Sequence, residues 1–366
     1  MIAGGGTGGH LFPAVAIAEE FLGRSEMNEV LFIGTQRGLE ARLLPSLGFV
    51  LRTITVQGMK GKGVRGMAKG LVKIPRGIAQ SISILREFRP DVAVGVGGYA
   101  SGPAVMAAHW MGIRTAVAEQ NAVPGFTNRI LGRFVDRVFL TFPDKEGRFA
   151  PSKKIITGNP VRKEFVQRIP VSSRKEKDTF SLLIFGGSQG ARAINRAILE
   201  SLRYLEDLKD RLSITHQTGM SDLDEVKAAY RDLKIAADVR PFITDMPSAY
   251  GAADLLICRA GATTIAEITA VGKASILIPF PFAVGGHQEL NARVLADAGA
   301  AEMIREDALD GTVLAGVIRE CAGHSERIRK METESKKLSN IQAAGRIVDE
   351  CMALLDGKPA QEVGRA

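Results

Sequence analysis

The chain has 366 residues, of which 45% are hydrophobic and 24% charged, and this length predicts two domains with well-formed cores. Its three widely spaced cysteines, Cys258, Cys321 and Cys351, argue against a disulfide framework and indicate reduced, cytosolic thiols. We expect neither a signal peptide nor a membrane-spanning helix, because no charged-then-apolar leader and no sufficiently long apolar run is present.

The formal net charge of +8 is concentrated in the first half of the chain. Residues 1–160 hold 20 Lys and Arg against 11 Asp and Glu, whereas residues 161–366 hold 28 against 29. A basic segment interleaved with apolar residues can bind an anionic membrane surface, each basic residue adding about 1 kcal/mol; a solvated basic loop is the alternative. Few aromatic residues and no recognised motif argue against nucleic acid. The densest basic segment, residues 57–77, includes Lys60, Lys62, Arg65 and Lys69.

The first predicted elements are a short strand, a glycine-rich loop at residues 4–10 and a helix. Glycines let a backbone approach a bound group closely, and the start of a helix favours an anion, typically phosphate. His10, at the end of the loop, can take up a proton near neutral pH. A structural hydrogen bond at the helix start is the alternative role for His10.

Gly4, Gly6 and Gly9 also satisfy the G-x-G-x-x-G pattern of dinucleotide-binding folds. An NAD site requires an acidic residue at the end of the second strand, but residues 34–37 read Gly-Thr-Gln-Arg. This argues against NAD, while Arg37 leaves an NADP site open as an alternative.

Strands and helices alternate through the first half, and the same plan restarts after a polar segment at residues 170–178. Alternation predicts parallel strands with crossover helices, so that ligand-binding loops collect at the carboxyl ends of the strands. We expect α/β architecture with two doubly wound Rossmann-like domains, residues 1–160 and 161–340, facing a central cleft. A helix at about 341–356 is expected to pack back on the first domain. The expected strands are 30–33, 50–56, 91–98, 115–118, 138–140, 180–185, 213–216, 239–243, 254–258 and 275–279.

Two segments of the second half carry candidate chemistry. Residues 259–267 follow a strand and open a helix, where the hydroxyls of Thr263 and Thr264 suit a phosphate. Glu267 could hold a pair of sugar hydroxyls, or Thr264-x-x-Glu267 could be a capping box. Asp222-Leu223-Asp224 resembles a metal-binding D-x-D but fits helix-start acidity better. No cluster has transition-metal spacing, so helix starts and basic side chains, with no metal or cofactor, are expected to stabilise a leaving diphosphate.

Six motifs in this order resemble the MurG family of peptidoglycan glycosyltransferases, glycosyltransferase family 28, over nearly the whole chain. The resemblance implies a GT-B fold and a metal-independent, inverting transfer of GlcNAc from UDP-GlcNAc to the 4-hydroxyl of MurNAc in undecaprenyl-pyrophosphoryl-MurNAc-peptide (lipid I), giving lipid II for the cell wall. It also implies a peripheral enzyme on the cytoplasmic face of the bacterial plasma membrane, with links to cell shape, cell division and the proteins of cell-wall synthesis. The motifs lie at residues 5–14, 97–103, 119–121, 158–162, 186–191 and 261–267.

The resemblance also assigns residues to roles. His10 matches the proposed base, and Gln288 the contact with GlcNAc. Ahead of Gln288, residues 283–286 read Ala-Val-Gly-Gly, where many relatives have charged residues, so no charged sugar contact is expected there. The remaining donor site would comprise Ser188, Thr263 and Thr264 at the diphosphate, Glu267 at the ribose, the Ile243 backbone at uracil, and the neighbouring Ala262, Ile265 and Ala266. Thr7, Gly8, Gly9, Asn121 and Arg162 would close the site from the first domain, with Tyr99 and Ser101 on the acceptor and membrane side.

Three rival functions remain open at this point. A UDP-GlcNAc 2-epimerase has the same two-domain plan and substrate but no lipid acceptor. Another GT-B lipid glycosyltransferase would accept diacylglycerol. An NADP-binding oxidoreductase would use the first glycine loop for its cofactor.

Overall fold

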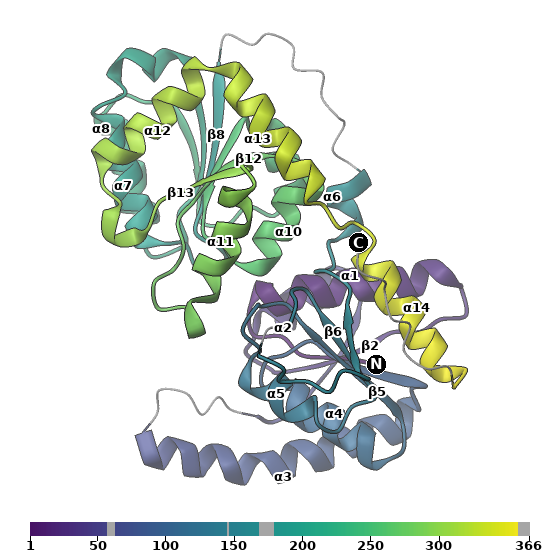
Figure 1. Cartoon of the computed structure of the whole chain (residues 1–366). Coiled ribbons are helices and arrows are strands. Elements are labelled where there is room, and N and C mark those ends of the chain that lie inside the picture. Colours follow the sequence, from purple (N-terminus) through teal and green to yellow (C-terminus); the bar gives the residue numbers. More distant parts are fainter. Residues whose placement is uncertain (57–62, 145, 168–178, 358–366) are drawn as a thin grey trace. The chain divides into compact units, whose positions relative to one another are not determined.

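The computed structural model describes residues 1–56, 63–144, 146–167 and 179–357 (Figure 1). The chain divides into two compact units, Met1–Arg162 with Ile341–Ala366, and Lys163–Asn340. Each unit is built around its own parallel sheet, so the prediction of two doubly wound Rossmann-like domains is confirmed. No described helix is long and apolar enough to cross a bilayer.

The first unit contains a parallel sheet in the order β3-β2-β1-β4-β5-β6-β7. Its central strand β1 has only two residues, yet Ile2 pairs with both Phe32 and Val94 and is buried. The strand order reverses between β1 and β4, which places a topological switch point at their carboxyl ends. The strands are β1 (Ile2–Ala3), β2 (Leu31–Gly34), β3 (Val50–Thr53), β4 (Val92–Gly95), β5 (Arg114–Glu119), β6 (Arg137–Leu140) and β7 (Lys154–Ile156).

Helices cover this sheet, and the last helix of the chain returns to it. Leu11, Val15 and Ala18 lie on one face of α1 and are buried in the core. Ile347 and Cys351 of α14 belong to the same core, and α14 lies beside α1 (Figure 1). The helices are α1 (Gly8–Arg24), α2 (Leu39–Ser46), α3 (Gly63–Phe88), α4 (Ser101–Trp110), α5 (Phe126–Leu131) and α14 (Ala343–Leu355).

The second unit repeats the plan with a parallel sheet in the order β10-β9-β8-β11-β12-β13. Its switch point lies between β8 and β11. The strands are β8 (Phe180–Phe185), β9 (Leu212–Gln217), β10 (Ala237–Arg240), β11 (Leu255–Cys258), β12 (Ala274–Leu277) and β13 (Ala301–Met303). The α-helices are α6 (Lys163–Gln167), α7 (Arg192–Leu202), α8 (Leu223–Asp232), α9 (Met246–Ala252), α10 (Ala262–Val271), α11 (His287–Asp297), α12 (Gly311–Gly323) and α13 (Ser325–Lys337).

Several strands differ from the sequence prediction. Those expected at 50–56 and 91–98 end at Thr53 and Gly95, and β10, β7 and β13 differ as well. The strand expected at 239–243 is β10, which ends at Arg240, because the N–H of Ile243 bonds to a side chain rather than to a neighbouring strand. Strands β7 and β13 were not predicted. Each has three residues at a sheet edge, too few for a recognisable apolar pattern.

Candidate functional site

Two glycine loops meet at the switch point of the first unit. They follow β1 and β4, and they pack backbone against backbone. A Cβ on Gly98 would lie 2.4 Å from the carbonyl oxygen of Gly5, and one on Gly4 would lie 2.5 Å from that of Gly97. Both Gly4 and Gly98 have positive φ, which other residues rarely adopt. The glycines are therefore needed for contact between the two loops.

A buried carboxylate fills the space beneath the first loop. Glu40 Oε2 accepts the N–H of Gly6 at 2.7 Å, and Oε1 accepts the N–H and hydroxyl of Thr35 at 3.0 and 2.7 Å. A Cβ on Gly5 or Gly38 would lie 2.5 or 2.0 Å from this carboxyl group. A phosphate at the Gly6 N–H would be repelled by this negative charge at short range. This contact with Glu40 does not favour the NADP alternative for the first loop.

His10 lies where this loop meets the segment after β5. Its Nδ1 is 2.9 Å from Gln120 Oε1, and its ring packs on Gly97, where a Cβ would lie 2.9 Å from Cε1. The buried Glu119 holds the same segment by accepting the N–H groups of Asn121 and Gly125, both at 2.9 Å. The structure thus brings together His10 and the predicted Asn121.

The other predicted residues of this unit lie around the start of α1. Thr7 is its N-cap residue, and Gly8 and Gly9 form its first turn. The Arg162 guanidinium carbon lies 4.3 Å from the ring centroid of Phe12, which also belongs to α1. These predicted residues therefore lie on or beside the first turns of α1.

The predicted acceptor-side residues divide into three groups. Tyr99 is 53% exposed, which a surface role requires. Ser101 is fully buried, with its Oγ 2.5 Å from where a Cβ on Gly95 would lie, so the prediction that it faces the acceptor or the membrane is wrong. Lys60 and Lys62 lie outside the described residues, and Arg65 and Lys69 belong to α3.

The second unit has its own pair of loops at its switch point. The loop after β8 packs on the turn after β9: a Cβ on Gly190 would lie 1.9 Å from the Thr218 carbonyl oxygen, and one on Gly219 would lie 2.1 Å from that of Gln189. Ser188 lies exposed in this loop. The loop after β11 leads into α10, whose N-cap is Gly261.

The start of α10 carries most of the predicted donor residues. Ala262, Thr263 and Thr264 form its first turn, with Thr263 buried, and Ile265 and Ala266 continue the helix. The buried Glu267 accepts a hydrogen bond from Tyr250 at 3.4 Å. The capping-box alternative is wrong, because Gly261 rather than Thr264 caps the helix.

Gln217, which the sequence reasoning missed, joins two of these segments. Its Oε1 accepts the N–H of Ile243 at 2.7 Å, and its Nε2 donates to the carbonyl of Gly187 at 2.8 Å. Gln217 is 2% exposed. Its place at the carboxyl end of a predicted strand was the available signal. The side chain ties the glycine loop to the Ile243 segment.

Gln288 lies in the first turn of α11, which follows two glycines with positive φ, Gly285 and Gly286. Its Oε1 accepts the N–H of Phe280 at 3.0 Å. The positive φ values explain the Gly-Gly pair ahead of this helix.

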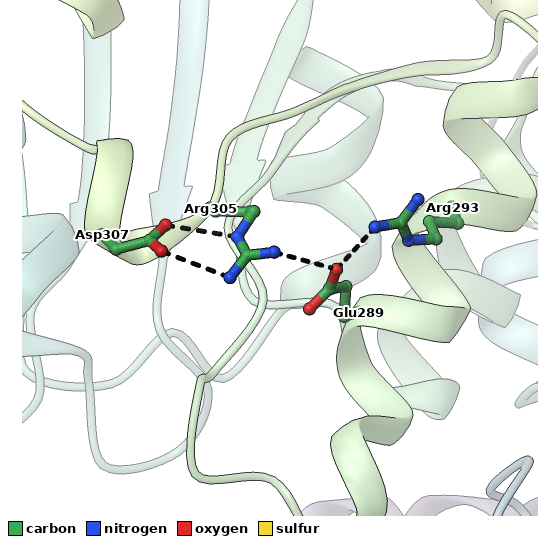
Figure 2. Close-up of polar contacts among 4 residues, drawn as sticks. All are labelled: Glu289, Arg293, Arg305 and Asp307. Carbon is green, nitrogen blue, oxygen red and sulfur yellow. Dashed lines mark hydrogen bonds and ion pairs between the residues drawn. The ribbon is translucent and has the colours of Figure 1, made fainter.

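Exposed ion pairs connect the start of α11 to the segment after β13. Figure 2 shows Arg305 between Glu289 and Asp307, with Arg293 on the other side of Glu289. The hydrogen bond from Arg293 lowers the pKa of Glu289. Arg259, the first residue of the candidate segment 259–267, donates to the carbonyls of Ile278 and Pro279, both at 3.2 Å, and pairs with Glu306 after β13.

A buried polar network supports the turn after β9 from below. Asn195 Nδ2 donates to the Thr218 carbonyl at 3.0 Å and to Asp222 at 2.8 Å, so its Oδ1 accepts from His216 Nε2 at 3.0 Å. His216 Nδ1 lies 3.1 Å from the Tyr230 hydroxyl. Asp222 is the N-cap residue of α8, which supports helix-start acidity over a metal-binding D-x-D. Within the described residues, no group of three or more metal-ligating side chains is assembled.

The two family models that match are the N-terminal domain of glycosyltransferase family 28, over residues 1–140, and its C-terminal domain, over residues 181–347. A relative from Syntrophus aciditrophicus, named UDP-N-acetylglucosamine–N-acetylmuramyl-(pentapeptide) pyrophosphoryl-undecaprenol N-acetylglucosamine transferase, is 58% identical over 97% of this chain and 98% of its own.

Among solved structures, MurG of Acinetobacter baumannii has a TM-score of 0.73 and 32% identity, covering 96% of this chain and 98% of its own. A putative UDP-N-acetylglucosamine 2-epimerase of Listeria monocytogenes has a TM-score of 0.72 but 12% identity, covering 99% of both chains. The epimerase likeness shows the fold alone, so sequence identity rather than shape separates these candidates.

The burial of His216 predicts a pH-dependent stability of the second unit. Burial lowers the pKa of His216 from 6.5 to about 3, so the unfolded chain binds a proton that the folded unit excludes. The stabilising effect of a neutral His216 is therefore complete above pH 6.5 and is lost as the pH falls toward 3. Urea unfolding between pH 5 and 7 should show a contribution of up to about 1.4 kcal/mol per pH unit that His216→Gln lacks.

The matched control is His324→Gln, which removes an exposed imidazole and should preserve the wild-type slope. Equal slopes for wild type and His216→Gln would contradict the prediction.

Proposed function

The chain belongs to glycosyltransferase family 28, and we propose that it transfers GlcNAc from UDP-GlcNAc to the 4-hydroxyl of MurNAc in lipid I, forming lipid II for peptidoglycan synthesis. The observation that carries this proposal is the 58% identity, over nearly the full length, to a relative named for that reaction. The identity of 12% to a solved epimerase does not favour epimerisation.

We place the donor in the second unit. Its diphosphate would meet Ser188 and the first turn of α10, where Thr263 and Thr264 add hydroxyls to the N–H groups of a helix start. Glu267 would hold the ribose hydroxyls and Gln288 the sugar. Because the N–H of Ile243 is bonded to Gln217, uracil would bind the carbonyl of Ile243.

His10 would act as the general base in the first unit. The proton of the acceptor hydroxyl moves to the imidazole as the oxygen bonds to the anomeric carbon. The bond from that carbon to the diphosphate breaks, and its electron pair leaves with UDP. A positioned base contributes roughly 10²–10⁴-fold to the rate, and helix starts would stabilise the charge that grows on UDP. Thr7, Gly8, Gly9, Asn121 and Arg162 would border the reacting groups.

We also propose peripheral binding to the anionic cytoplasmic face of the plasma membrane. Support comes from exposed apolar side chains on and beside α4 and α5: Trp110 and Phe126 are each 64% exposed, and Phe134 is 44% exposed. Exposed Arg129 and Arg133 lie among them and could pair with anionic lipid. We also propose that Lys60, Lys62, Arg65, Lys69 and Tyr99 contribute to membrane binding. Association with other cell-wall and division proteins belongs to the same proposal.

The transfer reaction can be tested directly with UDP-[¹⁴C]GlcNAc and a short-chain lipid I analogue. We expect label in a disaccharide lipid, with and without a chelator, and no UDP-ManNAc. His10→Ala should lower kcat by about 10²–10⁴-fold, because it removes the base.

The matched control is His109→Ala, which changes an exposed histidine of α4 and should leave kcat unchanged. UDP-ManNAc formation, or label transfer to diacylglycerol alone, would contradict the proposed reaction. Near-normal turnover in His10→Ala would contradict its role as the base.

Membrane binding can be measured by sedimentation with phosphatidylglycerol vesicles. Replacing Trp110, Phe126 and Phe134 together with serine should weaken binding about 10- to 100-fold, since each aromatic ring would lose apolar burial in the bilayer. The control is serine at Met27, Val50 and Met352, which are exposed on other elements of the same unit. Equal loss in both variants would contradict this surface.

A further inference from the structure

The orientation of the Gln120 amide is fixed by the backbone around it. Gln120 is 2% exposed, and its Nε2 donates to the carbonyl of Ala118 at 3.0 Å. Its Oε1 therefore points at His10 Nδ1, 2.9 Å away. The opposite orientation would set two oxygens against each other at the Ala118 carbonyl. The amide can only accept a hydrogen bond from the imidazole.

This acceptor determines the tautomer of His10. A neutral imidazole carries one proton, and a hydrogen bond accepted from Nδ1–H leaves the lone pair on Nε2. Among the described residues, no hydrogen bond is made to Nε2. The ring is also held in place by Gly97, whose positive φ and missing Cβ let the imidazole pack on the backbone.

We infer that Gln120 is a positioning residue, which holds His10 in the Nδ1–H tautomer and directs the Nε2 lone pair to the acceptor hydroxyl. This inference rests on the proposed function of His10 as the base. When Nε2 takes the proton, Nδ1–H stays bonded to Gln120, and the imidazolium charge is stabilised by the amide oxygen.

Variants of Gln120 separate this role from a structural one. In Gln120→Leu the acceptor is lost, but the Ala118 carbonyl keeps its bond from Asn128 at 3.2 Å, so no backbone group is left unpaired. Gln120→Glu keeps an oxygen facing Nδ1 when its other oxygen is protonated and donates to the Ala118 carbonyl in place of Nε2. The leucine variant should therefore lose the tautomer, and the glutamate variant should retain it.

The experiment is ¹⁵N NMR of the imidazole groups in the full chain, with the His10 signals assigned by their loss in His10→Ala. Wild type and Gln120→Glu should show a protonated Nδ1 and an unprotonated Nε2, whereas Gln120→Leu should show a mixture. In the transfer assay, Gln120→Leu should lower kcat about 10- to 100-fold with KM for UDP-GlcNAc unchanged, and Gln120→Glu should recover part of that loss.

Protonation of Nε2 in wild type overturns the inference, and so does an unchanged tautomer or an unchanged kcat in Gln120→Leu. A rise in KM with kcat unchanged would indicate a structural role and overturns it as well. The spectrum of the wild type is independent of catalysis. If lipid I is not a substrate, the proposed function is wrong, but the NMR spectrum still reports the tautomer of His10. If transfer occurs with the proton on Nε2, the inference fails and the function stands.

Discussion

The buried carboxylate of Glu40 is the interaction on which the first unit's site depends. It accepts the N–H of Gly6 and both donors of Thr35, so the glycine loop is held from within by the protein's own negative charge. The loop leads into the start of α1, which carries His10. Glu119 holds the segment after β5 in the same way. His10 and Gln120 meet between two loops, each fixed by a buried carboxylate.

The second unit uses the same fold with different electrostatics. Its glycine loop is held by the neutral amide of Gln217, and the turn beneath it by the neutral amide of Asn195. Neither amide is itself charged, which is consistent with the proposed placement of a diphosphate at Ser188 and the start of α10. The carboxylates of Asp222 and Glu267 lie beneath the turn and one turn further along α10. Under the proposed function, the duplicated architecture would supply a base in one unit and an anion site in the other.

The sequence predicted whatever depends on local pattern. The alternation of strands and helices predicted the two parallel sheets. The glycine-rich loops after strands indicated where both switch points lie, and the first of these loops ends at His10. Glu40 and Gln217 were missed because each acts on a partner 26 to 34 residues away, which no local motif reveals. Ser101 was misplaced for a related reason: its motif says nothing of burial, and the side chain packs against Gly95 inside the unit. The predicted end of β10 at residue 243 was wrong, because the N–H of Ile243 bonds to the side chain of Gln217 and not to a neighbouring strand.

The most direct measurement is a crystal structure of the chain with bound UDP-GlcNAc. We predict that the diphosphate lies in the second unit, against Ser188 and the first turn of α10, with the Gly6 N–H still bonded to Glu40 at close to 2.7 Å. A diphosphate bound to the N–H groups of the first glycine loop, with Glu40 displaced, would contradict it.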